Sequence, residues 1–181
     1  MLWIALFVFL IFIYIIITYN TLVKAKNIFK EAWSGIDVQL KRRFDLIPNL
    51  VETVKGYTSH EKQVLEEIAQ IRSQNTSLPN IQEISQSENQ LTESLKKLFV
   101  IAENYPELKA SENFLNLHTS LVKIEDELQM ARRYYNGTIR DYNTKIQTFP
   151  NNVVAGIFKF LPEQFFEIEL ATQRNTPEVK I

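Results

Sequence analysis

The first 17 residues of the chain carry no charged or strongly polar side chain, and no other feature constrains the fold as much. Such a run cannot remain in water, whereas an α-helix satisfies all its own backbone groups, as a lipid environment requires. At about 1.5 Å per residue, a helix extended to Val23 reaches roughly 30 Å, the thickness of a bilayer core. We therefore predict a transmembrane anchor over residues 1–23, with membrane lipid as its partner. The anchor residues that we name are Leu2, Trp3, Phe7, Phe9, Ile13 and Ile17.

A cleaved signal peptide is the alternative interpretation of this run. Such a peptide needs a basic segment before its apolar core and a small-residue cleavage site after it. Here no Lys or Arg precedes the run, and residues 18–21 offer no such site. The sequence therefore favours an uncleaved anchor. The absence of Cys also excludes a lipid-modified cysteine and a disulfide framework.

Basic residues follow the anchor closely, and none precedes it. Lys24, Lys26 and Lys30 come directly after the apolar run. Cytoplasmic flanks of membrane helices carry an excess of Lys and Arg. We therefore expect a single-pass protein of the cell membrane, with its amino terminus outside and its large part in the cytoplasm.

Composition limits the remainder to one helical domain. The formal net charge is -1 and the pI is about 6.2, so the chain lacks the basic field of a nucleic-acid-binding protein, and we expect no nucleic acid partner. Only four Gly and six Pro interrupt the sequence, which favours helices with short connections. We expect a helical bundle domain over residues 24–149 and a Phe-rich C-terminal segment and tail over residues 150–181.

Apolar residues recur at steps of three and four in four stretches, residues 29–44, 47–71, 81–102 and 114–146. An amphipathic helix must bury its apolar stripe, and four such helices joined by short linkers should pack as antiparallel neighbours. We therefore predict an all-α fold. An N-terminal transmembrane helix would continue into an antiparallel up-down four-helix bundle.

Pro48 leaves two interpretations of the second stripe open. Asp45 ahead of a proline predicts that a new helix starts there, and the alternative is one long helix kinked at Pro48. Gly56 weakens the stripe slightly but need not end the helix. Trp33 and Tyr57 both fall on apolar stripes, so we expect their rings to lie in the core.

The fourth helix of an up-down bundle returns toward the bilayer, so the segment that follows it should arrive at the membrane. This segment is rich in Phe and flanked by Arg140 and Lys145. It either lies in the membrane interface or on another membrane protein, or its Phe side chains close the open end of the bundle. The residues concerned are Phe158, Phe160, Phe165, Phe166 and Lys159.

Several polar side chains lie on or beside the apolar stripes, where unpaired polar groups are costly. They are Asp37, Arg43, Asn113, Glu125, Arg132, Asn136, Arg140 and Asn143. We expect them to pair between helices and fix the helix register, and a binding groove for a partner protein is the alternative. The specific hypothesis pairs carboxylates of the first helix with arginines of the fourth, namely Asp37 and Asp45 with Arg132, Arg133 or Arg140.

The sequence contains no motif for catalysis or for metal or cofactor binding. His60 and Glu61 begin like the helix of a zinc protease, but Val64 stands where the second His belongs. The chain has only two His, and its four Gly are scattered singly, so zinc ligands and a phosphate-binding loop are both lacking. We therefore expect no metal, no cofactor and no enzymatic activity.

Long polar motifs resemble those of the LemA family of bacterial membrane proteins. They include AWSGIDVQLKRRFDLIPNLVETVKGY at residues 32–57, AENYPELKA at residues 102–110 and ARRYYN at residues 131–136. The resemblance covers nearly the whole chain and implies a single N-terminal span followed by an antiparallel helical bundle. It supplies no activity, although relatives are associated with membrane organelle formation and with membrane proteases of envelope stress.

The function that we expect is that of a membrane-anchored, non-enzymatic helical scaffold or adaptor of the bacterial envelope. The expected interactions are self-association into a homo-oligomer and binding to other membrane proteins such as envelope proteases. The alternative is a membrane-remodelling or lipid-interface protein that acts through the Phe-rich segment.

Overall fold

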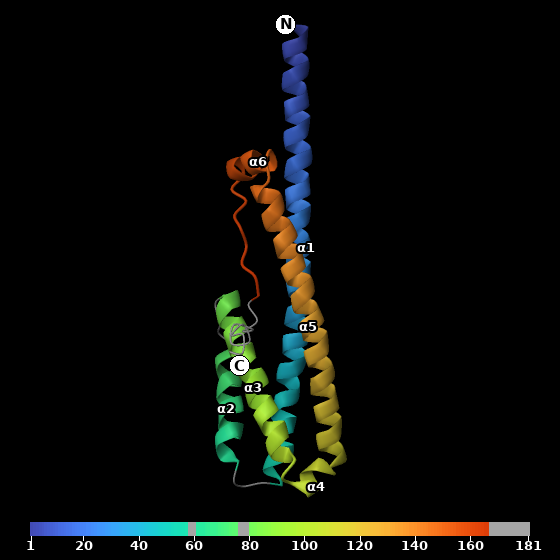
Figure 1. Cartoon of the computed structure of the whole chain (residues 1–181), viewed down its shortest axis with the longest axis vertical. Helices are drawn as coiled ribbons and strands as arrows, with labels where there is room; N and C mark the ends of the chain where they lie inside the picture. Colours follow the sequence, from blue (N-terminus) through green and yellow to red (C-terminus); the bar gives the residue numbers. More distant parts are fainter. Residues whose placement is uncertain (58–60, 76–79, 167–181) are drawn as a thin grey trace, which may run out of the picture. The chain divides into compact units, whose positions relative to one another are not determined.

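A computed structural model describes residues 1–57, 61–75 and 80–166 of the chain. These residues form six α-helices and no β-strand (Figure 1). The helices are α1 (Leu2–Lys55), α2 (Lys62–Asn75), α3 (Ile81–Ala102), α4 (Pro106–Lys109), α5 (Glu112–Gln147) and α6 (Asn151–Ile157). The all-α class and the continuation of the apolar helix beyond the anchor are thereby confirmed. The finer expectation, an antiparallel up-down four-helix bundle, stays a prediction.

The first helix, α1, is continuous over 54 residues and passes through Pro48. A proline inside a helix removes one backbone hydrogen bond and costs about 3 kcal/mol or more. Ile47, Leu50 and Val54 are buried on either side of this position, and their packing stabilises the helix across it. Of the two interpretations left open at Pro48, the structure therefore shows the continuous helix and not a new helix start.

This helix nevertheless ends earlier than the second apolar stripe suggests. α1 stops at Lys55, Gly56 and Tyr57 form a turn, and α2 begins at Lys62. The Tyr57 N–H donates to the carbonyl of Val54 at 3.0 Å, which tightens the last turn. Glycine disfavours a helix by about 1 kcal/mol relative to alanine, so the expectation that Gly56 need not end the helix is wrong. Tyr57 is exposed, which also corrects its expected place in the core.

The described residues divide into two compact units. We call residues 1–38 with residues 128–165 the anchor unit, and residues 39–127 with Phe166 the α2–α3 unit. The helices α1 and α5 each contribute one part to each unit. The domain boundaries expected after residues 23 and 149 stay a prediction.

The α2–α3 unit has a hydrophobic core built from the apolar stripes of its helices. The helices α2 and α3 lie side by side and run antiparallel (Figure 1). Residues three and four apart share one side of a helix, which explains which side chains are buried. The core consists of Ile47, Leu50, Val54, Leu65, Ile68, Ile71, Leu91, Leu95, Leu98, Ala102, Leu108, Phe114 and Leu121.

A buried arginine connects three helices of this unit. Arg43 of α1 is only 2% exposed, and its Nη1 lies 3.1 Å from Glu88 Oε2 of α3 and 3.2 Å from Glu125 Oε2 of α5. Its Nη2 donates to the hydroxyl of Thr92 at 2.8 Å. The expectation that polar residues beside the stripes pair between helices is met at Arg43 and Glu125. Such a network fixes the register of the three helices, because each partner accepts the cation at one position only.

In the anchor unit, aromatic rings pack between α1 and α5. The ring centroids of Phe29 and Tyr142 are 5.0 Å apart, and those of Trp33 and Tyr135 are 5.5 Å apart. Phe29 and both tyrosines are buried, whereas Trp33 is half-buried at the edge of this core. Edge-on ring pairs of this kind add about 0.5–1.5 kcal/mol beyond the area they bury.

Candidate functional site

The apolar run of α1 is exposed along its length. Its most apolar 18-residue window has a mean hydropathy of 2.7, and only 6% of that window is buried. A core helix of a water-soluble protein can match this length and composition, but it is mostly buried. All the anchor residues named from the sequence, from Leu2 to Ile17, are exposed. α1 is therefore a candidate membrane span.

The helix α6 lies against α1 within the anchor unit (Figure 1). The Tyr14 hydroxyl donates to Asn151 Oδ1 at 2.7 Å. The Tyr19 ring lies 4.8 Å from the ring of Phe158 and 5.8 Å from that of Phe160, measured between centroids. The Phe-rich segment therefore contacts α1 at the end of its apolar run.

Residues 161–164, which we call the strap, are attached to α5 by side chains that bind main-chain atoms. Asn143 Nδ2 donates to the Glu163 carbonyl, and Asn143 Oδ1 accepts from the Glu163 N–H, both at 2.9 Å. The Tyr142 hydroxyl donates to the Leu161 carbonyl at 3.0 Å. Asn143 was expected to pair between helices, and instead it recognises an extended backbone.

A second tyrosine fixes the end of the strap. The Tyr135 hydroxyl donates to the Gln164 carbonyl at 3.2 Å. Burial, with a smaller contribution from the Glu163 carboxylate, raises the pKa of Tyr135 from 10.0 to about 12. The same two causes, burial first, raise the pKa of Tyr142. Both phenols therefore stay protonated and able to donate throughout the physiological range.

We predict that the anchor unit loses stability as the pH rises from 10 toward 12. The folded-state pKa of Tyr135, about 12, lies above the unfolded value of 10.0, so its contribution is complete below pH 10 and disappears as the pH passes 12. Tyr135→Phe should remove part of this dependence and the hydrogen bond to the strap, worth about 1 kcal/mol. Phenolate absorbance and helical circular dichroism, followed against pH, measure both effects.

The matched control for this titration is Tyr134→Phe. Tyr134 neighbours Tyr135 on α5, but its side chain is exposed. This variant should keep both the late ionisation and the alkaline loss of stability of the unmodified chain. Identical titration curves for the two variants would contradict the assignment.

The Phe residues that were expected to contact lipid or close the bundle differ in their exposure. Phe158 and Phe165 are exposed and Phe160 is half-buried. Phe166 belongs to the α2–α3 unit and is 1% exposed, so it cannot contact lipid as expected. Lys159 is exposed and has a left-handed backbone with φ 57°, at the turn that ends α6.

The predicted charge pairs between the first and fourth helices are not seen within the anchor unit. Asp37 and Arg133 are exposed, Arg132 is buried, and Asp37 pairs with none of the described arginines. Arg140 Nε lies 3.6 Å from the carboxylate that follows it in the sequence. The pairing of Asp45, which lies in the other unit, stays a prediction.

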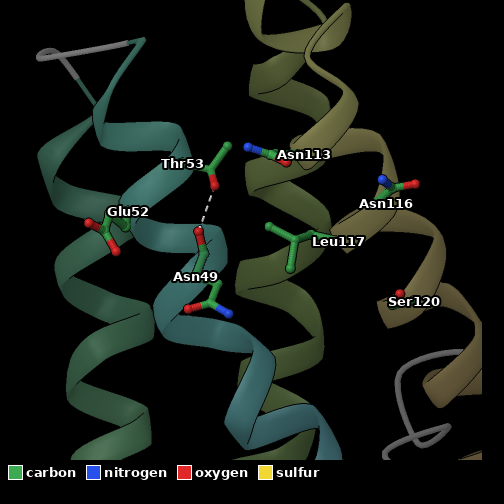
Figure 2. Close-up of a pocket in the computed structure, with 7 residues that line it drawn as sticks. All are labelled: Asn49, Glu52, Thr53, Asn113, Asn116, Leu117 and Ser120. Atoms are coloured by element: carbon green, nitrogen blue, oxygen red, sulfur yellow. Dashed lines mark hydrogen bonds between the residues drawn. The ribbon is translucent and has the colours of Figure 1, made fainter.

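A groove in the α2–α3 unit is lined mainly by amide and hydroxyl side chains of α1 and α5. Its volume is about 520 Å³, within the range of sites that bind small molecules or short peptide segments. Figure 2 shows Thr53 of α1 and Asn113 of α5 pointing toward each other, with Leu117 beside them. The lining residues are Asn49, Glu52, Thr53, Asn113, Asn116, Leu117 and Ser120.

The groove offers hydrogen bonds rather than reactive groups. The Thr53 hydroxyl donates to the Asn49 carbonyl at 2.7 Å. The side-chain amides of Asn49, Asn113 and Asn116 have no hydrogen-bond partner among the described residues. An amide presents two donors and an acceptor, and it does not titrate near neutral pH. The groove can therefore recognise peptide-like groups, and Glu52 is its one ionisable lining residue.

The described residues provide no group of three or more His, Asp or Glu that could hold a metal ion. His60 of the incomplete zinc-protease pattern lies outside the described residues. The other histidine, His118, packs its ring edge-on against Phe99 at 4.4 Å and stacks near Phe114. His118 is therefore packed against aromatic rings and belongs to no cluster of potential metal ligands among the described residues.

The two units carry opposite net charge. Residues 1–38 and 128–165 contain eight Lys and Arg against four Asp and Glu, a net of +4. Residues 39–127 contain ten basic against 14 acidic residues, a net of -4. The net charge of the whole chain, -1, conceals this division, which is visible in the sequence only when the charges of each segment are summed separately.

An all-α chain with a long exposed apolar helix belongs to the class of helical proteins with a candidate membrane span, which is α1 among the residues that the structure describes. Within that class, the chain belongs to the LemA family, whose sequence profile matches residues 32–181. The resemblance inferred from the motifs is thereby confirmed.

Two relatives support this membership. The chain is 33% identical over 140 residues to Protein LemA of Metamycoplasma hominis, a match that covers 75% of this chain and 63% of the relative. It is 22% identical over 179 residues to Magnetosome protein MamQ 2 of Paramagnetospirillum magneticum, which covers 84% of this chain and 66% of the relative. The chain therefore spans slightly less than two thirds of the length of these relatives.

Proposed function

We propose that this protein is a membrane-anchored, non-enzymatic adaptor that binds an extended segment of a partner protein in the amide-lined groove. One observation carries the proposal. The same helix, α1, supplies the candidate span at its start and the groove residues Asn49, Glu52 and Thr53 near its end. A partner bound there would be retained at the membrane.

The chemistry of the groove favours a peptide backbone as its ligand. Asn49, Asn113 and Asn116 present donors and acceptors in one groove. The chain itself uses this chemistry elsewhere, because Asn143 binds both the N–H and the carbonyl of Glu163. An extended segment seated between Asn49 and Asn113 could form the same pair of hydrogen bonds.

The wider setting of the adaptor is part of the proposal. The α2–α3 unit would lie in the cytoplasm, as the basic residues after the apolar run suggest. Self-association and binding to envelope proteases would provide its partners. The MamQ relatives are named for a cell structure, the magnetosome, rather than for a reaction, which supports an assembly role.

Photo-crosslinking in living cells tests this function. A photoreactive amino acid at Asn116 should yield discrete crosslinked products, because this residue lines the groove. The double substitution Asn49→Leu and Asn113→Leu should reduce their yield roughly tenfold, since each lost hydrogen bond is worth about 0.5–1.5 kcal/mol. Gel mobility and mass spectrometry measure the products.

The same probe at Asp126 provides the control. Asp126 is exposed on α5 but does not line the groove. We expect no product that depends on Asn49 or Asn113 from this position. Products of equal yield in the presence and absence of the double substitution would refute the groove as the binding site.

A further inference from the structure

The helix α6 has one packed side and one bare apolar side. Val154 and Ala155 are each 2% exposed. Val153 and Ile157, four residues apart on α6, are 54% and 64% exposed, and Phe149 just before the helix is 79% exposed. A helix of seven residues that leaves two large apolar side chains uncovered, with an exposed Phe just before it, is suited to an apolar surrounding on that side.

The packed side of α6 fixes its depth along the candidate span. Asn151 accepts a hydrogen bond from Tyr14, which lies inside the apolar run. Tyr14 precedes the end of that run at Ile17 by three residues, or about 4.5 Å of helix. The run requires hydrocarbon around it. A helix in hydrogen-bond contact with Tyr14 therefore lies at the boundary between the hydrocarbon and the headgroups.

The backbone directly after α6 is suited to this boundary because the N–H groups of residues 158–160 are all paired. The N–H of Phe158 donates to the Val154 carbonyl at 3.1 Å, and that of Phe160 donates to the Ala155 carbonyl at 2.9 Å. The strap that follows is hydrogen-bonded to α5, as described above. An unpaired backbone group costs several kcal/mol in hydrocarbon, so a segment without such pairing could not remain there.

We propose that α6, with Phe149 before it and Phe158 and Leu161 after it, is a second membrane-contacting element that lies in the bilayer interface beside the span. The bound surface is a lipid leaflet, because α6 contacts Tyr14 inside the apolar run and its own bare side chains are apolar. Lys145, at the end of α5, and Lys159, just after α6, are exposed and favour anionic headgroups. This inference rests on membrane insertion of α1 and is independent of the groove.

Spin labelling of the full chain in vesicles tests the proposal. The chain has no Cys, so a single Val153→Cys or Ile157→Cys substitution gives one labelled position. In phosphatidylcholine vesicles, we expect the label at either position to be at least about twofold more accessible to oxygen, which concentrates in lipid, than the same label in water-exposed surroundings. Its accessibility to a water-soluble nickel complex should fall correspondingly.

The control is Val122→Cys, another exposed valine on a helix, which belongs to the α2–α3 unit. Its label should be accessible to the nickel complex and show no lipid signature. Labels at residues 153 and 157 that match the control would overturn the proposal. Low accessibility of these two labels to both reagents would also overturn it, because a second copy of the chain or another protein would then cover α6. Unchanged circular dichroism shows that each variant is folded.

A comparison of neutral and anionic vesicles tests whether Lys145 and Lys159 bind anionic headgroups. Addition of phosphatidylglycerol to the vesicles should move the label at Ile157 deeper into the bilayer. The double substitution Lys145→Gln and Lys159→Gln should abolish this shift while leaving the depth in phosphatidylcholine alone unchanged. A shift that persists in the double variant would refute recognition of anionic headgroups by these lysines.

Discussion

Replacing Arg43 by alanine is expected to destabilise the α2–α3 unit by about 3–5 kcal/mol, because it removes the cation that two carboxylates share. The guanidinium lies 3.1 Å from Glu88 and 3.2 Å from Glu125, and the Glu88 side chain is only 5% exposed. Without Arg43, the largely buried Glu88 side chain would lose the guanidinium that lies 3.1 Å from it. Urea unfolding of the full chain in detergent, followed by circular dichroism, measures the change in the free energy of unfolding.

Arg42→Ala is the matched control for this substitution. Arg42 precedes Arg43 in the sequence and forms an ion pair with Glu127 at 2.7 Å, but its side chain is 49% exposed. Exposed ion pairs contribute about 0–1 kcal/mol, so this variant should unfold almost as the unmodified chain does. Combining Arg43→Met with Glu88→Leu should recover much of the loss, because it removes the buried charge itself. An equal loss in Arg42→Ala and Arg43→Ala would contradict the role assigned to the network.

The substitutions Phe9→Lys and Ile13→Lys, made together, are expected to abolish integration of the chain into membranes. A lysine near the centre of a membrane helix is unfavourable by about 2.5–3.5 kcal/mol, and each lost Phe or Ile removes about 0.3–0.6 kcal/mol of favourable insertion. The pair therefore opposes insertion by roughly 6–8 kcal/mol. Both residues are exposed on α1, so the helix itself should persist. Alkaline extraction of membranes, with quantification of the released protein, measures the outcome.

Two lysines introduced outside the apolar run distinguish this effect from a general effect of charge. Val100 and Val122 are exposed apolar residues of α3 and α5. The variant Val100→Lys with Val122→Lys should remain in the membrane fraction after alkaline extraction. Retention of the Phe9 and Ile13 double variant in that fraction would show that the apolar run is not the anchor.

The helices were predictable where a repeating apolar stripe faces a core. Ile68, Leu91, Leu98 and Leu128 lie on such stripes, and all four are buried. Their positions follow from the helical period alone, because residues three and four apart share one side. The exposed run at the start of α1 was predictable for the complementary reason, since it is apolar on every side.

Helix ends and polar partners were less predictable because they depend on neighbours far away in the sequence. Local preference suggested a break at Pro48 and none at Gly56, but burial on both sides of Pro48 reverses the first expectation. The spacing marked Arg43 as a polar residue beside a stripe without identifying Glu88 as its partner. That choice depends on the register between α1 and α3, which no single-helix pattern contains.

The strap could not be derived from the sequence at all. It has no periodicity, and Asn143 reaches Glu163 across 20 positions of the chain. The expectation for the Phe-rich segment treated its aromatic residues as one group. The structure instead divides them among α1 contacts, exposed positions and the buried Phe166, because Phe158 and Phe160 lie at the turn that ends α6 whereas Phe165 and Phe166 follow the strap.

The strap is attached to α5 through its main-chain carbonyls and one N–H, which hydrogen-bond to Tyr135, Tyr142 and Asn143. These hydrogen bonds do not depend on which side chains the strap carries. For this attachment the side chains can therefore change, with two exceptions. Proline at position 163 would lack the N–H that donates to Asn143, and Leu161 belongs to the proposed membrane-contacting element. Homologues should therefore conserve Tyr135, Tyr142 and Asn143 of α5, while the strap sequence after Leu161 varies.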